Sequence, residues 1–280
     1  MNQDKIEFIQ NSLIQHGKNN DRIYIMKIGT ENIVLLVNAI NILANKNKYS
    51  KIFAKVHSAQ TNNFFQDGYK TEAVIKGYFN GNSDAFLMVK YLSPERAVLK
   101  NKVEIDSIIE TAKRKAGNSP KKKNISYEII KCSKQHSRQM SDLYKLVFKT
   151  YPFPIDDHKY IEQTMDENIT YFAAVKDEEI IALSSCETDK QVQSVEMTDF
   201  ATLPQYLGNG IALELLKEME KYMIDNNFIT AYTIARSISA AMNITFAKNA
   251  YEYTGTLINN TNISGNIESM NIWVKNLLRE

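Results

Sequence analysis

The spacing of apolar residues along the C-terminal half predicts alternating strands and helices. Apolar and polar residues alternate over 125–130, as in a strand with one buried face. Over 134–149 the apolar residues recur at helical spacing, and Pro152 and Pro154 end that helix because proline disfavours helix in the residue before it. The further elements expected are a short helix 157–166, strands 170–175, 180–188 and 193–203, a helix 211–225, a strand 230–236, a helix 243–249, and strands 254–259 and 268–274.

This order of elements predicts an α/β fold with a mixed sheet and helices on both of its faces. The segment 113–124, KRKAGNSPKKKN, is polar and basic and has no apolar period, which is typical of a linker. It divides the chain into an N-terminal α/β domain over 1–112 and a second domain over 125–280.

The two halves share a faint internal repeat. Segments 51–92 and 231–277 each show the pattern of a strand, a short helix, a tyrosine, a strand, a glycine-bearing loop and a strand. Tyr69 then corresponds to Tyr251, and Lys90 to Lys275. Coincidence between two ordinary α/β units is the alternative.

Composition narrows the classes of function. The chain has 280 residues and a formal net charge of +2, which gives no large field to attract nucleic acid or an anionic membrane. The apolar stretch 33–44 is too short to span a bilayer, and the N-terminus lacks a signal pattern. The two cysteines and four scattered histidines predict neither a disulfide framework nor a metal site. We therefore expect a cytoplasmic protein without a metal.

The most informative segment is a glycine-bearing turn after the strand 193–203. Gln205, Gly208 and Gly210 lie between Pro204 and the start of the amphipathic helix 211–225. Free backbone N–H groups and the positive end of the helix dipole meet at such a point, which makes it a site for a pyrophosphate. The spacing is neither a Walker motif nor GxGxxG, which argues against a nucleoside triphosphatase and a dinucleotide fold.

Gln205-x-x-Gly208-x-Gly210, in this order of strands, resembles the signature of the GNAT acetyltransferases over residues 125–280. The resemblance implies the acyl-CoA N-acyltransferase fold, acetyl-CoA as co-substrate, and a degenerate GNAT-like unit in the N-terminal half. That half has no such turn, so we assign it no catalysis. The cofactor contacts implied are Phe200, Ala201, Thr202, Gln205, Leu207, Gly208, Asn209, Gly210, Ile211, Ala212, Asn243 and Phe246.

Within that superfamily the chain resembles the beta-lysine N-acetyltransferases. The resembling segments are YPFP (151–154), EMTDFAT (196–202), YTIAR (232–236), MNITF (242–246), GTLINNT (255–261) and ESMNIW (268–273), with FAKV (53–56) and Gly68-Tyr69 in the N-terminal half. The resemblance implies acetylation of the side-chain amine of L-beta-lysine to give N-epsilon-acetyl-beta-lysine, a compatible solute. It also implies lysine 2,3-aminomutase as the enzyme that supplies the substrate.

The acceptor must react as a neutral amine, and an alkylammonium pKa of about 10.4 calls for a general base at neutral pH. Glu196, on the strand that leads into the turn, is the first candidate, and Asp199 is the second, on the opposite face if the strand is regular. Backbone N–H groups near 200–202 are candidates for stabilising the oxyanion. Phe246 occupies the position at which many GNAT enzymes carry an acidic tyrosine, so the proton donor is open between water, Tyr251, Tyr253 and none.

The predicted substrate contacts are less defined. Arg236, at a strand end, is a candidate for the carboxylate, with a salt bridge as the alternative. Asn259 and Asn260 are expected in a loop between the last two strands, as polar contacts or as turn formers. Tyr151 and Phe153 are expected either to wall the site or to pack in the core.

Two other functions remain open at this stage. In the first, the chain catalyses the same acetyl transfer, but the acceptor is another small amine or a protein amine. Alternatively, the chain is a non-catalytic module that binds acyl-CoA.

Overall fold

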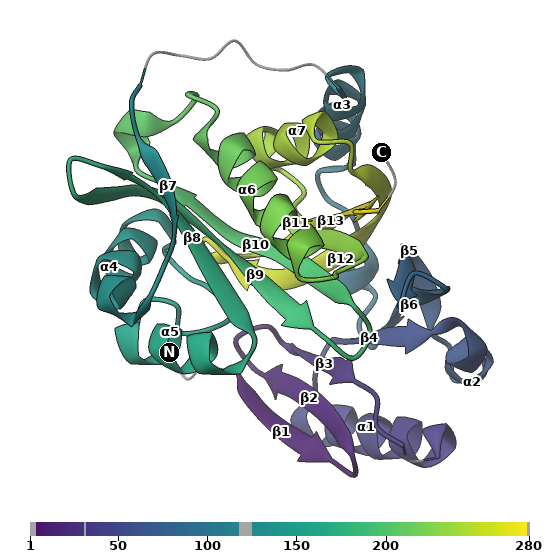
Figure 1. The fold of residues 1–280 in the computed structure, drawn as a ribbon. Helices are drawn as coiled ribbons and strands as arrows, with labels where there is room; N and C mark the ends of the chain where they lie inside the picture. The colour runs from purple at the N-terminus through teal and green to yellow at the C-terminus, as the bar shows by residue number, and fades with distance from the viewer. Residues whose placement is uncertain (1–3, 31, 118–124, 279–280) are drawn as a thin grey trace.

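The computed structural model describes residues 4–30, 32–117 and 125–278, and it contains two β-sheets with helices packed against them (Figure 1). The N-terminal half contains β1 (Lys5–Ile9), β2 (Ser12–Gly17), β3 (Arg22–Lys27), α1 (Ile33–Asn47), β4 (Lys51–His57), α2 (Thr61–Gln66), β5 (Lys70–Phe79), β6 (Ser83–Tyr91) and α3 (Lys102–Arg114). The C-terminal half contains β7 (Glu128–Lys131), α4 (Ser137–Val147), α5 (His158–Glu167), β8 (Ile169–Lys176), β9 (Glu179–Asp189), β10 (Ser194–Thr202), α6 (Ile211–Asp225), β11 (Thr230–Arg236), α7 (Ala240–Lys248), β12 (Glu252–Ile263) and β13 (Asn266–Asn276).

Both sheets are mixed, as the α/β pattern predicts. The N-terminal order is β1-β2-β3-β4-β6-β5 and the C-terminal order is β12-β13-β11-β10-β9-β8-β7. In each sheet two antiparallel pairs of strands are followed by one parallel pair. Helix α1 connects the parallel strands β3 and β4 of the N-terminal sheet, and α6 connects β10 and β11 of the C-terminal sheet. The six strands β1–β6 therefore follow the same path as β8–β13.

Side chains at equivalent places in the two sheets repeat this correspondence. The rings of Phe64 and Tyr69 pack edge-on at 5.0 Å, and those of Phe246 and Tyr251 at 5.1 Å. Lys90 lies 5.8 Å from the centre of the Tyr69 ring, and Lys275 lies 5.7 Å from that of Tyr251.

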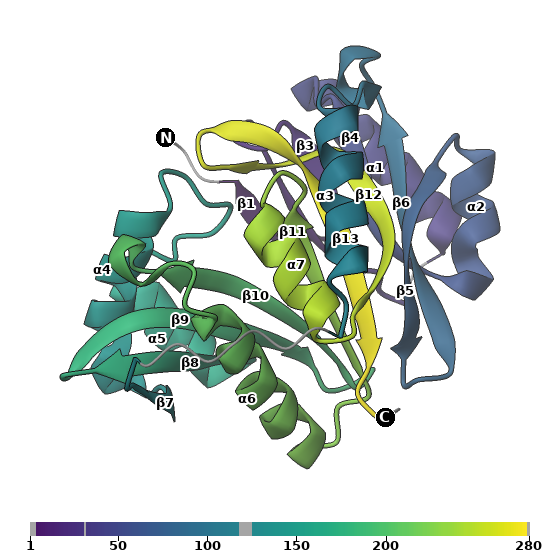
Figure 2. The same ribbon diagram turned by 90° about the horizontal axis from the view of Figure 1, so that it is seen from above.

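The two halves share a hydrophobic core. Strands β4, β5 and β6 bury apolar side chains against β11, β12 and β13, and this core contains Phe53, Ile75, Tyr78, Leu87, Tyr232, Leu257, Met270 and Ile272. Helix α3 leaves the N-terminal half and packs beside α7 (Figure 2), burying Ile105, Ile109 and Ala112 at helical spacing.

The predicted helix 211–225 and strand 230–236 are confirmed residue by residue. The predicted loop between the last two strands is wrong, because β12 continues to Ile263 and the hairpin turns at Ser264 and Gly265. The predicted linker is also too long at its start, since α3 runs to Arg114, and its residues 118–124 lie outside the described part. Within the described ranges, every helix is too short or too polar to cross a membrane.

The contact between the halves leaves no room for a side chain at Gly255. A Cβ built there lies 2.1 Å from the carbonyl oxygen of Glu72 and 2.8 Å from the Cα of Ala73. We expect Gly255→Ala to destabilise the protein by about 1–3 kcal/mol, because β5 and β12 must move apart.

Calorimetry checks this, and the expected result is one cooperative transition at a lower Tm, since the halves share a core. Gly265→Ala is the control, because a Cβ at that turn has nothing within 4 Å and meets only the cost of a positive φ of 90°. An equal loss in both variants would contradict the steric argument.

Candidate active site

Strands β10 and β11 separate shortly after they begin to pair. Their parallel register runs from Ser194 opposite Thr230 to Glu196 opposite Tyr232, and beyond that point β10 pairs with β9 alone. A register shift between Thr198 and Ala201 bends β10 further. Beyond Glu196, the backbone groups on the β11 side of β10 therefore have no partner on β11 and face an opening between the two strands.

A cavity of about 1440 Å³ occupies this opening and extends to the N-terminal sheet. Its cofactor-side lining contains nine of the predicted contacts: Phe200, Thr202, Leu207, Gly208, Asn209, Gly210, Ile211, Ala212 and Phe246. Its far side is lined by residues of β3, β4 and β5, namely Arg22, Tyr24, Phe53, Lys55 and Tyr78. The cavity thus connects the glycine turn to the N-terminal half.

The turn before α6 presents unpaired donors to the cavity. The backbone N–H groups of residues 208–212 donate to no acceptor in the described chain, and no side chain caps α6. Gly208 and Gly210 have φ values of 74° and 81°, a conformation in which side chains with a Cβ are disfavoured. Such a cluster of N–H groups at a helix N-terminus suits an anion.

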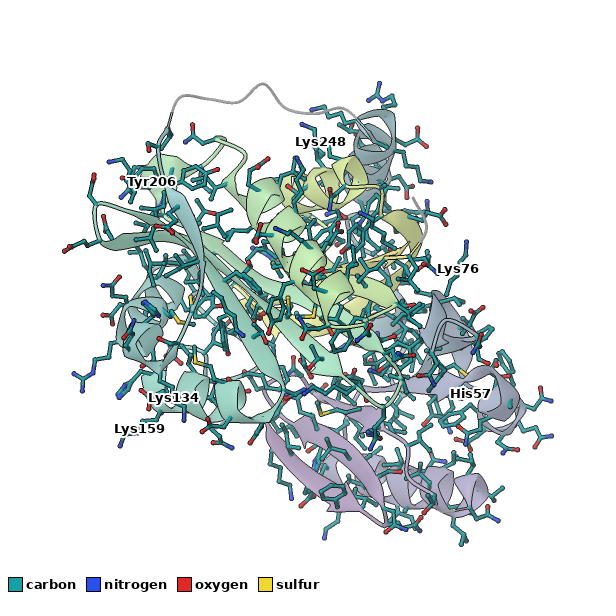
Figure 3. All side chains as sticks on the ribbon, in the orientation of Figure 1. His57, Lys76, Lys134, Lys159, Tyr206 and Lys248 are labelled. Atoms are coloured by element: carbon teal, nitrogen blue, oxygen red, sulfur yellow. The ribbon has the colours of Figure 1, made fainter. Side chains whose placement is uncertain are left out.

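Figure 3 shows Tyr206, from this turn, and Lys248, from the end of α7, on the side of the molecule away from the N-terminal sheet. Both side chains line the cavity. Lys248 adds a positive charge to the lining of the cavity, and no sequence pattern had singled it out.

Three predicted cofactor contacts do not line the cavity. Ala201 is buried, and Gln205 is exposed on the outer side of the turn. Asn243 is a structural centre: its Oδ1 accepts from Trp273 Nε1 and Asn271 Nδ2 at 2.8 Å, and its Nδ2 donates to the carbonyls of Arg236 and Ser239. All the hydrogen-bonding capacity of this amide is used to fix the N-terminus of α7 to β11 and β13.

Glu196 lies on the cavity wall at the point where β10 and β11 separate. Burial raises its pKa to about 8, and the negative charges of Glu187 and Asp199 act in the same direction, while Lys55 and a hydrogen bond from Tyr232 oppose them. A carboxyl with this pKa exchanges protons near neutral pH, as a general base must.

Glu187 and Lys55 were not predicted, and both line the cavity. Glu187 is the cross-strand partner of Glu196 on β9, and burial raises its pKa also. The ammonium of Lys55 lies 4.5 Å from the centre of the Tyr78 ring and 5.7 Å from that of Tyr232. Burial opposes its charge, yet Tyr78, Tyr24 and Glu196 keep the pKa of Lys55 raised. A lysine within the apolar strand IFAKV (52–56) was a usable signal.

Asp199 lines the same cavity as Glu196, and the opposite face expected for a regular strand is wrong. Its φ of 55° lies within the bulge, which turns the side chain toward the opening. Its carboxylate accepts hydrogen bonds from the hydroxyls of Tyr151 and Ser185, the latter at 2.5 Å. Burial raises the pKa of Asp199, and these donors oppose the rise. The bonds hold it in place as a fixed acceptor.

The position of the expected acid carries no hydroxyl. Phe246 is buried, and the centre of its ring lies 5.6 Å from that of Phe200 and 5.1 Å from that of Tyr251. Phe246 also lines the cavity. Tyr251 and Tyr253 do not line it, so neither reaches the opening as a proton donor.

The predicted substrate contacts divide in two. Tyr151, Phe153 and Asn260 line the cavity. The Arg236 guanidinium also borders it but is held by Glu268 through bonds of 2.8 and 2.7 Å, so the salt-bridge alternative describes it. Asn259 does not line the cavity, because its amide donates to the carbonyls of Arg96 and Val98 at 2.9 Å.

Comparison with known proteins identifies the family of the chain. Residues 140–243 match the acetyltransferase (GNAT) family. The beta-lysine N(6)-acetyltransferase of Methanococcus maripaludis is 42% identical over 97% of this chain and 98% of that protein. The N-acetyltransferase YodP of Bacillus subtilis is 36% identical over 75% of this chain and 76% of that protein. The beta-lysine N(6)-acetyltransferase of Methanosarcina mazei is 30% identical over 86% of this chain and 97% of that protein. The chain therefore belongs to the GNAT family of acetyltransferases.

Proposed function

We propose that the protein transfers the acetyl group of acetyl-CoA to the side-chain amine of L-beta-lysine, giving N-epsilon-acetyl-beta-lysine. The observation that carries the proposal is the continuous cavity that joins a turn with unpaired backbone N–H groups to a partly buried pair of carboxyls. The two beta-lysine acetyltransferases named above support the choice of acceptor. A compatible solute is the expected product, and lysine 2,3-aminomutase is the expected source of the substrate.

The turn at 208–212 would hold the pyrophosphate of coenzyme A, since five backbone N–H groups and the dipole of α6 are directed there. Acetyl-CoA supplies an acetyl thioester in the opening between β10 and β11. Backbone N–H groups of β10 that lack a partner on β11 would stabilise the negative charge that develops on the carbonyl oxygen.

Glu196 would accept the proton of the substrate ammonium, directly or through water. The neutral amine then forms a bond to the acetyl carbon, the carbon–sulfur bond breaks, and the electron pair leaves on sulfur as a thiolate. The nitrogen, which is positively charged after it attacks, releases its second proton to water, and the neutral amide results. With Phe246 at the usual acid position, the thiolate leaves without protonation by this helix, which its pKa of about 8.5 allows. Glu187 adds a second negative charge that attracts the incoming ammonium.

A small acceptor fits this cavity better than a protein amine does. Residues of β3, β4 and β5 line its far side, so the N-terminal half contributes a wall at the acceptor end. This half would be a degenerate GNAT unit that has kept the strand order, while a side chain, Asn32, caps α1 where α6 has the open turn.

Removing the carboxyl of Glu196 should identify the base. We expect Glu196→Gln to lower kcat/KM by about 100-fold or more, since general-base catalysis is worth that much. In the wild type, kcat/KM should rise with pH through a pKa of about 8, and the variant should lose this limb. Glu252→Gln, at an exposed glutamate paired with Lys76, is the control.

The same variant has a second readout in stability. A folded-state pKa raised from 4.5 to about 8 makes the wild type lose stability as pH rises between those values, because the unfolded state releases its proton first. The Tm of Glu196→Gln relative to wild type should therefore be higher at pH 8 than at pH 5. A pH limb that persists in the variant would remove Glu196 from the role of base.

A carboxylate placed in the glycine turn should prevent cofactor binding. We expect Gly210→Glu to weaken acetyl-CoA binding at least about tenfold, measured by calorimetry, because like charges meet at the pyrophosphate site. Gly265→Glu has a comparable positive φ at an open hairpin turn and should leave binding unchanged. Full binding by the Gly210 variant would show that the cofactor lies elsewhere.

The choice of acceptor is tested by CoA release with L-beta-lysine, L-alpha-lysine, spermidine and a lysine peptide. We expect kcat/KM for L-beta-lysine to exceed the others by about tenfold or more, as a site that pairs the substrate's polar groups rejects misplaced ones. Turnover of another amine would keep the chemistry and change the substrate. Tight acetyl-CoA binding without any turnover would favour an acyl-CoA-binding module.

A further inference from the structure

Arg22 is a buried cation at the far end of the cavity. It begins β3, whose Ile23 and Ile25 point into the N-terminal core. Because side chains alternate along a strand, Arg22, Tyr24 and Met26 point the other way, and all three line the cavity. The Arg22 side chain is 4% exposed.

Arg22 differs from the other buried arginine and lysine side chains of the described chain in having no carboxylate within ion-pair distance, and the charge of Asp4 acts on it only from further away. Lys51 lies 3.6 Å from Glu72, and Arg96 lies 3.8 Å from Asp21. Arg22 Nη1 instead donates to the carbonyl of Asn260 at 2.5 Å and to Thr261 Oγ1 at 3.2 Å, and its Nε has no partner. A buried charge is costly unless it is paired, so this guanidinium is suited to an anion that the chain itself does not supply.

Two aromatic rings hold the guanidinium in place. Its Cζ lies 5.5 Å from the centre of the Tyr24 ring and 5.8 Å from that of Phe53. Burial lowers the pKa of Arg22 to about 10, so it remains a cation at neutral pH. A fixed, charged and planar donor is what bidentate binding of a carboxylate requires.

The position of Arg22 relative to Glu196 suits an extended amino acid. Tyr24 lies two residues further along β3, which is about 7 Å. Burial raises the pKa of the Tyr24 hydroxyl, and the charge of Glu196 adds to that rise while Lys55 opposes it. The Tyr24 side chain therefore lies between the Arg22 cation, which is 5.5 Å from its ring, and the carboxyl of Glu196. The cavity is continuous across that interval.

We propose that Arg22 binds the carboxylate of the acceptor amino acid and thereby directs its distal amine toward Glu196. The neighbouring Asn260 would accept a hydrogen bond from the ammonium next to that carboxylate, because its Oδ1 is buried without a partner. This inference rests on the proposed function for the identity of the amine, and it assigns substrate selection to the N-terminal half.

The test compares L-beta-lysine with 1,4-diaminopentane, which is the same molecule without its carboxylate. We expect wild type to prefer L-beta-lysine strongly. Arg22→Gln should lower kcat/KM for L-beta-lysine by about 100-fold, as expected when one partner of a buried charge pair is removed, and leave that for 1,4-diaminopentane nearly unchanged. Arg22→Lys should restore part of the loss, since it keeps the charge.

Arg96→Gln is the matched control for a structural role. Arg96 also joins the N-terminal half to β12, donating to the Asn259 carbonyl at 2.7 Å, but it does not line the cavity. A structural defect lowers kcat/KM for both amines by the same factor, and that result in Arg22→Gln would overturn the proposal. So would a wild type that does not distinguish the two amines.

Failure of the proposed function would look different. Wild type would then leave L-beta-lysine unreacted and turn over another amino acid. The same comparison would be made with that amino acid and its decarboxylated form, and the Arg22 proposal would stand or fall on the same difference in kcat/KM.

Discussion

Glu187 and Glu196 are paired on neighbouring strands along the wall of the cavity, and this pair of like-charged side chains is the constraint on which the site depends. Two carboxyls in that position disfavour each other's ionisation. The compensating cation, Lys55, comes from β4 of the N-terminal half. The base therefore acquires its pKa of about 8 only when both halves are assembled around the cavity.

That dependence gives a physical reason for the shared core. Strands β4–β6 bury apolar side chains against β11–β13, which fixes the strand that carries Lys55 opposite the strand that carries Glu196. The two sheets have the same path, yet the two halves contribute different groups: the C-terminal half has the open glycine turn, and the N-terminal sheet supplies Arg22 and Lys55. The two copies of the repeated fold thus have different proposed roles: the C-terminal copy holds the cofactor, and the N-terminal copy completes the acceptor end of the cavity.

Local sequence patterns predicted what depends on local structure. The helix 211–225, the strand 230–236 and the glycine turn follow from periodicity, helix-terminus chemistry and backbone conformation, so few distant contacts were needed to place them. The face of Asp199 was mispredicted because a bulge breaks the alternation of β10. Bulges are set by pairing with a neighbouring strand, which a single segment does not specify.

The two arginines show most clearly what the sequence could not supply. Arg22 begins β3 and Arg236 ends β11, so in the sequence both look like arginines at the end of an apolar strand. Their difference lies in distant partners: Glu268 pairs directly with Arg236, while Arg22 is enclosed with no carboxylate within ion-pair distance. A charge is available to a ligand when the fold buries it and leaves it uncompensated, and that property belongs to the assembled structure rather than to either residue.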